Sequence, residues 1–368
     1  MPIADHGILY RYARDFEIAK TVKTRTQLVT MSDPSDPQQH LRAHHIVALE
    51  TQFCSIPEFD LRPCSYTLKS YPKTLRSQIS ERIHDASIII TTTIRLDATS
   101  LSAEVCPNLR VIAVMATGVD SIDLDACRKR GITVLNCAGA NVIAVSEHVI
   151  GMYFAVRRRF VQTQAAVRSG LWSAKGTLIP MLQDQAGKMP LTCREETMGL
   201  IGYGAIGKKI EGLAKALGFR VVVADRKNAS SVRAGRVTFE DCLRLSTVIV
   251  IVIPRTPETI GLISRVELAK MSASTVLINA SRGDIVDEAA VVAAVRTGAI
   301  AGVAFDVFSQ EPADSNTSPL LAPQNQDLNI LTTPHTAWLA NTTMTSLQRI
   351  VKEGLEGWFQ GHPMNVVT

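Results

Sequence analysis

Short runs of β-branched and aliphatic residues alternate with longer amphipathic segments along most of this chain. In its first half the apolar runs cover residues 46–49, 88–90, 111–114 and 133–135. Such alternation is typical of βαβ units, in which helices cover a parallel sheet. The sequence therefore predicts an α/β fold from about residue 45 onward.

A second series of the same kind follows residues 141–159, a segment with helical periodicity that is long enough to link two domains. The predicted strands of this series are residues 198–201, 221–224, 248–253, 276–279, 303–305 and 330–332. Six strands is the number in a dinucleotide-binding sheet. Residues 342–359 predict a last amphipathic helix, ended by Gly361 and Pro363. Because 368 residues exceed the usual size of one hydrophobic core, we expect two domains.

Composition narrows the class of protein. Apolar residues make up 46% and charged residues 20% of the chain, a balance typical of globular proteins. The longest aliphatic run, residues 248–253, is far shorter than the roughly 18 residues of a membrane helix, so we expect no membrane partner. The net charge of +5 is scattered, which disfavours nucleic acid as a partner. The run Arg157, Arg158 and Arg159 is expected to be a solvated helix end.

Seven cysteines lie far apart, with no C-x-x-C pair and no histidine at zinc-ligand spacing, so we expect no metal site. This odd number, without a secretory signal, favours buried, reduced thiols in a cytoplasmic protein. Residues 1–43 lack strong periodicity and are expected to form an extension outside the core, with the first strand beginning at Ile46. Cationic residues in this extension suggest a mitochondrial transit peptide as the alternative, but Asp5, Asp15 and Glu17 dilute that pattern.

A glycine-rich turn joins the first strand and the first helix of the second series. Gly202, Gly204 and Gly207 form a G-x-G-x-x-G pattern, with Ala205 and Ile206 between the last two. The first glycine would permit a tight turn, the second would let backbone amides approach a pyrophosphate, and the third would let the helix pack on the strand. The helix N-terminus would then favour the phosphate charge. A plain strand-to-helix turn is the alternative, which the surrounding strand, helix and acid disfavour.

Asp225 follows the next strand, 18 positions after Gly207, close to the spacing of about 20 expected of a ribose-binding acid. A carboxylate there accepts hydrogen bonds from ribose hydroxyls and repels a 2′-phosphate, which favours NAD over NADP. Arg226 and Lys227 would attract a 2′-phosphate instead. NAD is therefore the expected cofactor, with NADP as the alternative.

Three later segments each place a polar group after a predicted strand, at the edge where doubly wound sheets bind ligands. Arg282, Glu311 and His335 occupy these positions. Together they would bind and protonate an anionic carbonyl compound. Taken singly, Arg282 could be a surface ion-pair partner, Glu311 an acid at a helix start and His335 a hydrogen-bonded loop histidine. Their joint appearance after a nucleotide site favours catalysis.

The order and spacing of these motifs closely resemble the D-isomer-specific 2-hydroxyacid dehydrogenase family. The matching pieces are MATGVDSIDL, the helix at residues 141–158, GYGAIG, IPRTPETIGLI, NASRGDIVDE, DVFSQEP and TPHTAW. The resemblance covers nearly the whole chain from about residue 45. It implies two doubly wound parallel-sheet domains, a Rossmann NAD domain inserted in a flavodoxin-like substrate domain. It also implies a homodimer, for which the helix at residues 141–159 would be the natural contact.

We assign residues 1–43 to the extension, residues 44–155 and 337–368 to the substrate domain, and residues 156–336 to the NAD domain. By the same resemblance, backbone amides of Ala116, Thr117 and Gly118 would bind the substrate carboxylate. Asp306 would contact the nicotinamide carboxamide. The other residues expected at the cofactor are Ile253, Pro254, Ala280, Arg282 and His335.

These roles predict an NAD(P)-dependent oxidoreductase that converts a 2-oxo acid into the D-2-hydroxy acid. Arg282 would hold the carboxylate by a bidentate, charge-assisted contact and polarise the carbonyl group. Protonated His335 would donate to the carbonyl oxygen. Glu311, hydrogen-bonded to the imidazole, would favour its protonated form.

Trp338 resembles the tryptophan in the TPHIAW form of hydroxypyruvate and glyoxylate reductases, where its ring would close a small substrate pocket. Hydroxypyruvate or glyoxylate is therefore the expected substrate, and a larger aliphatic 2-oxo acid is the alternative. Packing at a domain hinge is the alternative role for this ring. Formate dehydrogenases have Gln where Glu311 stands, which disfavours that activity. Arg255 replaces a leucine common in the family and leaves the coenzyme preference open.

Two other functions share this fold. A transcriptional corepressor would keep the Arg, Glu and His but act as an NAD-sensing binding protein. A catalytically slow relative would be retained in a biosynthetic pathway. The sequence contains no obvious nuclear basic cluster, which favours the enzyme over the corepressor.

Overall fold

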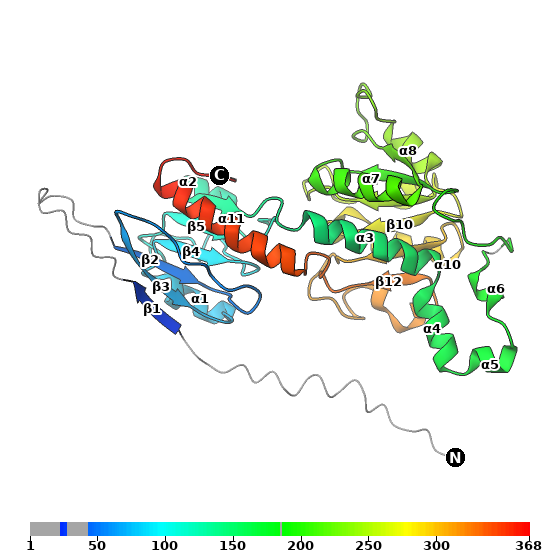
Figure 1. The fold of residues 1–368 in the computed structure, drawn as a ribbon, viewed down its shortest axis with the longest axis horizontal. Helices are drawn as coiled ribbons and strands as arrows, with labels where there is room; N and C mark the ends of the chain where they lie inside the picture. The colour runs from blue at the N-terminus through cyan, green and yellow to red at the C-terminus, as the bar shows by residue number, and fades with distance from the viewer. Residues whose placement is uncertain (1–22, 28–42, 185) are drawn as a thin grey trace, which may run out of the picture. The chain divides into compact units, whose positions relative to one another are not determined.

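The computed structural model describes residues 23–27, 43–184 and 186–368, which belong to two compact units (Figure 1). The first unit combines the described part of Met1–Ala140 with Met344–Thr368, and the second is Asn141–Thr343. Each unit contains a six-stranded sheet with helices, so the predicted α/β class is confirmed. Because the first unit draws on both ends of the chain, the second is an insertion within it.

The sheet of the first unit has the strand order β1-β3-β2-β4-β5-β6. Its neighbours pair in parallel apart from β1, which runs antiparallel to β3. The strands are β1 (Lys23–Gln27), β2 (Ala43–Ala48), β3 (Ser65–Ser70), β4 (Ile88–Thr91), β5 (Val111–Val114) and β6 (Thr133–Asn136). The helices are η1 (Arg76–Gln78), α1 (Ile79–Ile83), α2 (Leu124–Arg130) and most of α11 (Asn341–Phe359).

Two strands of this sheet were not predicted. The prediction that the first strand begins at Ile46 was wrong, because β1 lies within residues 1–43 and β2 starts at Ala43. β3 has the sequence SYTLKS, in which Tyr66 is the one buried side chain. Its apolar pattern is too weak to mark a strand, although β3 pairs on both sides. The other predictions about the extension concern residues 1–22 and 28–42, which lie outside the described residues.

The sheet of the second unit has the order β12-β11-β10-β9-β7-β8, with every pair parallel. All six predicted strands of this series are confirmed, with small shifts at their ends. The strands are β7 (Thr197–Ile201), β8 (Arg220–Val223), β9 (Val248–Ile251), β10 (Val276–Asn279), β11 (Gly302–Phe305) and β12 (Ile330–Thr332).

Helices cover both faces of this second sheet. The helices of the whole unit are α3 (Val142–Arg157), α4 (Phe160–Arg168), α5 (Leu171–Lys175), α6 (Ile179–Leu182), α7 (Ala205–Leu217), α8 (Phe239–Leu245), α9 (Arg265–Leu268), α10 (Glu288–Arg296), η2 (Gly283–Ile285), η3 (Pro319–Leu321) and η4 (Pro323–Asn325). Apolar side chains of α3 and α7 pack with Val248 and Ile278, whereas those of α8 and α10 pack with Ile249 and Leu277. Adjacent strand residues thus enter opposite cores, which explains the unbroken apolar runs. Helix α3 belongs to this unit, although the sequence had assigned residues up to 155 to the substrate domain.

Arg157 is not the solvated helix end that the sequence predicted, because only 7% of it is exposed. Its Nη2 donates to an oxygen of Glu196 at 3.0 Å, and the Tyr153 hydroxyl donates to the other oxygen at 3.1 Å. Its guanidinium also donates to the carbonyls of Thr247 and Ser274, both at 2.9 Å. Pairing with a carboxylate and hydrogen bonding permit the burial of this charge, and they join the end of α3 to the sheet.

Two expectations from composition concern the state of the cysteines and the presence of a membrane helix. All seven cysteines are free thiols, and five are buried: Cys54, Cys106, Cys127, Cys137 and Cys242. Burial raises the pKa of Cys137 to about 12, so this thiol stays protonated and unreactive at neutral pH. Within the described residues, no helix has the length and apolarity needed to cross a bilayer.

Candidate active site

Three adjacent parallel strands place Arg282, Glu311 and His335 at one edge of the second sheet. Arg282 follows β10, Glu311 follows β11 and His335 follows β12. The imidazole Nδ1 of His335 lies 2.6 Å from Oε2 of Glu311, and Arg282 is close enough for its charge to act on that carboxylate. The structure therefore brings the three side chains together.

The electrostatics of Glu311 keep it ionised. Burial alone would raise its pKa, but the hydrogen bond with His335, the Phe308 amide at 2.9 Å and the charges of His335 and Arg282 together lower the pKa below its usual value. An ionised Glu311 accepts a hydrogen bond from the Nδ1–H group of the imidazole. The Nε2 atom of His335 is then the one left to exchange a proton with a substrate.

The backbone of His335 has a left-handed conformation, with φ of +53°. This conformation costs a non-glycine residue about 1–2 kcal/mol. Three hydrogen bonds hold it. The His335 amide donates to the carbonyls of Asp306 at 2.7 Å and Thr333 at 3.0 Å, and the Trp338 indole donates to the His335 carbonyl at 2.8 Å. Trp338 thus stabilises the turn that presents the imidazole.

Asp306 is the buried anchor of the same turn, with only 1% of its surface exposed. Its Oδ1 accepts from the Thr333 hydroxyl at 2.5 Å and the Thr336 amide at 2.9 Å, and its Oδ2 accepts from the Ala337 amide at 3.0 Å. From the family resemblance we expected this side chain to contact the nicotinamide carboxamide. In the structure both carboxylate oxygens bind the segment that carries His335.

Three residues important to this geometry were missed from the sequence. Gly283 follows Arg282, and a Cβ added there would lie 1.9 Å from the carbonyl carbon of Phe308, so glycine alone permits the two loops to approach. Asn279 donates to the carbonyl of Arg282 at 2.9 Å and shapes its turn. His148 of α3 reaches the Thr333 hydroxyl at 3.0 Å. The NASRG motif contained a signal for the first two, whereas His148 is too distant in sequence to be associated with the site.

The glycine-rich turn has the geometry that a dinucleotide requires. Gly202 has φ of +108°, and an added Cβ would lie 2.3 Å from the carbonyl oxygen of Val252. Helix α7 starts at Ala205 without a side-chain cap, and the space above Gly204 is open. Ile206 and Gly207 complete the first helical turn. These residues therefore fit a pyrophosphate on the helix N-terminus.

The other predicted cofactor residues follow neighbouring strands of the same sheet. Ile253 and Ala280 are partly buried after β9 and β10, and Pro254 is exposed. Arg255, the departure from the family pattern, pairs with Asp284 at 2.8 Å. Asp225 follows β8, but its carboxylate already binds Arg233.

The predicted carboxylate-binding loop follows β5 in the first unit. The Ala116 carbonyl accepts from the Cys137 amide at 2.9 Å, and the Thr117 carbonyl accepts from the Asn136 side chain at 2.8 Å. Gly118 completes the loop and is partly buried. These bonds attach the loop to the last residue of β6 and to the residue that follows it.

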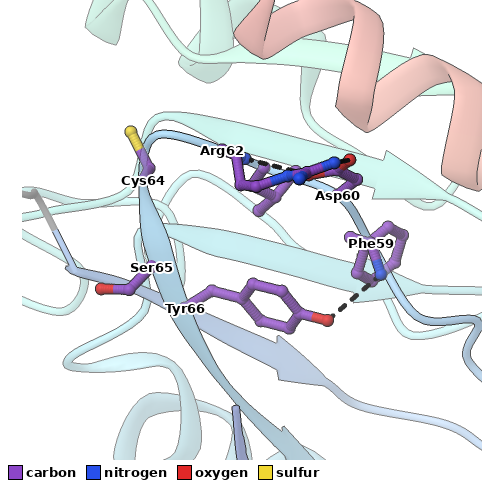
Figure 2. Close-up of a pocket in the computed structure, with 7 residues that line it drawn as sticks. Phe59, Asp60, Arg62, Cys64, Ser65 and Tyr66 are labelled. Atoms are coloured by element: carbon purple, nitrogen blue, oxygen red, sulfur yellow. Dashed lines mark hydrogen bonds and ion pairs between the residues drawn. The ribbon is translucent and has the colours of Figure 1, made fainter. Parts of the chain in front are cut away.

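A separate cavity of about 220 Å³ in the first unit contains none of the predicted site residues. Figure 2 shows that its polar groups face one another: the Phe59 amide donates to the Tyr66 hydroxyl at 3.1 Å, and Arg62 donates to Asp60 at 2.7 Å. The other lining residues are Leu61, Cys64 and Ser65. This cavity therefore lacks the arrangement of an acid, a base and an anion-binding cation that the sheet edge provides.

Comparison with known proteins identifies the fold and the family. The sequence profile described as "D-isomer specific 2-hydroxyacid dehydrogenase, NAD binding domain" matches residues 150–337. The chain belongs to the D-isomer-specific 2-hydroxyacid dehydrogenase family. Members of this family are NAD(P)-dependent oxidoreductases that act on CH–OH groups, so the predicted family, the class of enzyme and the use of a nicotinamide coenzyme are confirmed.

The similarity extends over most of the chain. The glycerate dehydrogenase of Methylorubrum extorquens is 36% identical over 323 residues, which cover 86% of this chain and 96% of the relative. The glyoxylate reductase of Aeropyrum pernix is 33% identical over 306 residues, which cover 82% and 88%. The crystal structure of the TT0316 protein from Thermus thermophilus matches with a TM-score of 0.70 and 28% identity, and covers 88% of this chain and all of that one.

We expect Asp306→Asn to reduce the free energy of unfolding by about 1–3 kcal/mol, because an amide nitrogen would face one of the donors that the carboxylate now satisfies. Urea denaturation measures this change. The matched control is Asp327→Asn, since Asp327 is exposed and its replacement should change stability by less than about 0.5 kcal/mol. Equal stability of the two variants would contradict the anchoring role of Asp306.

Proposed function

We propose that this chain reduces hydroxypyruvate to D-glycerate, or glyoxylate to glycolate, with a reduced nicotinamide coenzyme. The observation that carries the proposal is the 2.6 Å contact between His335 and Glu311 beside Arg282, at the edge of a sheet that begins with a dinucleotide turn. The relatives named glycerate dehydrogenase and glyoxylate reductase support the substrate class, since glycerate is the hydroxy acid formed from hydroxypyruvate. A larger aliphatic 2-oxo acid is the alternative substrate.

Each of the three side chains has a separate role in the proposed reaction. The bound nicotinamide supplies the hydride. Arg282 binds the carboxylate of the 2-oxo acid, and its charge polarises the neighbouring carbonyl group. His335 gives the proton on Nε2 to the carbonyl oxygen, while the negative charge of Glu311 stabilises the imidazolium that donates it. In the oxidative direction neutral His335 takes the proton back.

Binding roles follow the same plan. The turn at Gly202, Gly204 and Gly207, with Ala205 and Ile206, would hold the coenzyme pyrophosphate on α7. Ile253, Pro254 and Ala280 would surround the nicotinamide, and the loop of Ala116, Thr117 and Gly118 would bind the substrate carboxylate. In this proposal the second unit, Asn141–Thr343, acts as the NAD domain, and the first unit acts as the substrate domain. Trp338 would close one wall of the substrate pocket.

We also propose that the protein is a homodimer. The segment that contains α4, α5 and α6 exposes large apolar side chains, each about half accessible: Phe160 54%, Val161 49%, Trp172 54%, Ile179 54% and Met189 59%. Apolar side chains concentrated in this way are typical of interaction surfaces. With α3, this segment would face a second copy. Sedimentation equilibrium should give about twice the chain mass of 40.0 kDa, and a monomer at micromolar concentration would contradict the proposal.

The expected compartment is the cytoplasm, with the mitochondrion as the alternative. The seven free thiols support a reducing environment. Fractionation of cells that express the full chain distinguishes between these two compartments.

Coenzyme oxidation with hydroxypyruvate, glyoxylate, 2-oxoisovalerate and pyruvate at equal concentrations tests the proposed function. We expect turnover, with the first two acids preferred. His335→Ala should lower kcat by about 10²–10⁴, because the positioned acid is lost, while coenzyme binding is unchanged. No turnover with any acid, together with normal coenzyme binding, would favour an NAD-sensing binding protein.

Glu311→Gln should move the fall in reduction rate to lower pH, by about one pH unit or more. The lowered pKa of Glu311 keeps it anionic throughout the assay range, and its replacement removes the negative charge beside the imidazole that donates the proton. A pH profile of kcat measures the shift. The matched control is Glu353→Gln on α11, whose partner is Arg349. Profiles that coincide for the wild type and Glu311→Gln would disprove the role of Glu311.

A further inference from the structure

The carboxylate of Asp225 is already occupied. The side chain is only 3% exposed. Its Oδ1 accepts from the Arg226 amide at 2.8 Å and from Nε of Arg233 at 2.9 Å, and its Oδ2 accepts from the Arg233 amide at 2.8 Å. A second nitrogen of the Arg233 guanidinium also donates to Oδ1. A ribose diol would have to displace a charged, bidentate partner to reach this acid.

The charge of the same loop is strongly positive. Residues 226–236 contain Arg226, Lys227, Arg233 and Arg236 and no acidic residue. The acids near this loop are paired with cations: Asp225 with Arg233, Glu267 with Lys227 at 2.9 Å and Glu211 with Lys215 at 2.7 Å. Within the part of the chain that the structure describes, no acid forms an ion pair with Arg226, which is exposed, or with Arg236.

The loop lies beside the dinucleotide turn. The Arg236 guanidinium stacks over the ring of Tyr203, in the glycine-rich turn, at 5.5 Å, and it donates to the Ala224 carbonyl at 3.2 Å. β7 and β8 are neighbouring parallel strands, so their following loops lie at the same edge of the sheet. In folds of this kind that edge receives the adenosine ribose.

Arg233 is held so that it can bind a further anion. Asp225 uses Nε and one terminal nitrogen of the guanidinium, which leaves N–H groups on the other terminal nitrogen. The side chain is 54% exposed. Asp225 thus acts here as a positioning residue for Arg233, and a planar guanidinium is well matched to phosphate oxygens.

We propose that this chain prefers NADP(H) to NAD(H), with Arg226, Arg233 and Arg236 binding the 2′-phosphate of the adenosine ribose. The proposal rests on the proposed function in one respect, that the second unit binds a nicotinamide coenzyme at the glycine-rich turn. It goes further in naming the coenzyme and the residues that select it.

Calorimetric binding of NADPH and NADH, and of 2′-phospho-AMP and AMP, tests the proposal without catalysis. Each phosphorylated ligand should bind about ten- to hundredfold more tightly than its partner, the range expected of one or two charge-assisted contacts. Arg233→Ala should reverse the order, because it removes a cation and frees the Asp225 carboxylate for the ribose hydroxyls. Arg226→Ala should weaken the binding of NADPH and leave the binding of NADH unchanged. The control is Arg244→Ala, an exposed residue on α8 that should leave both affinities unchanged.

NADH binding as tight as NADPH in the wild type would overturn the proposal, as would a preference that persists in both Arg226→Ala and Arg233→Ala. Equal loss of both affinities in Arg233→Ala would show a structural role and would also overturn it. Failure of the wild type to bind either dinucleotide would overturn this proposal and the coenzyme site together. Preferential NADPH binding without reduction of any 2-oxo acid would support this proposal and contradict only the proposed catalysis.

Discussion

Parallel pairing of β10, β11 and β12 is the constraint from which the chemistry of this chain follows. Parallel strands end at the same edge of their sheet, so residues that follow them meet although they are far apart in sequence. Arg282, Glu311 and His335 are brought together in this way, and the glycine-rich turn lies at the same edge after β7. Apolar clusters on both faces of the sheet hold these strands, of which β10 and β11 are fully buried and β12 is a partly buried edge strand.

Strand order alone does not orient the side chains. A hydrogen-bonded framework behind them does so. The Asp306 carboxylate accepts hydrogen bonds from backbone amides of the turn after β12 and so fixes that turn. Gly283 allows the loop that carries Arg282 to contact the backbone of the loop that carries Glu311. The left-handed backbone of His335 is held by hydrogen bonds from its amide to neighbouring carbonyl groups. A strained backbone held by its surroundings is typical of residues at functional sites. The orientation of the imidazole is therefore determined by all the loops at this edge of the sheet and not by His335 alone.

The sequence predicted those parts of the fold whose pattern is local. Residues 111–114 and 276–279 form buried strands and residues 330–332 a partly buried one, all with the predicted bounds, because parallel strands of this kind are short, rich in apolar residues and flanked by turns. The meeting of Arg282, Glu311 and His335 followed from their positions after strands. β3 was missed because its polar residues hide the pattern, and the burial of Arg157 was missed because its partner Glu196 is distant in sequence. Occupation of Asp225 by Arg233 depends on the path of a loop, which spacing does not reveal.

The central claim is that Arg282 and His335 act on one substrate, with Glu311 behind the imidazole. A crystal structure with the oxidised coenzyme and oxamate, an unreactive analogue of a 2-oxo acid, tests this most directly. The account predicts that the oxamate carboxylate contacts the guanidinium of Arg282 and that its carbonyl oxygen lies within hydrogen-bond distance of Nε2 of His335. Oxamate bound away from either side chain, or an imidazole turned away from Glu311 in the complex, would contradict it.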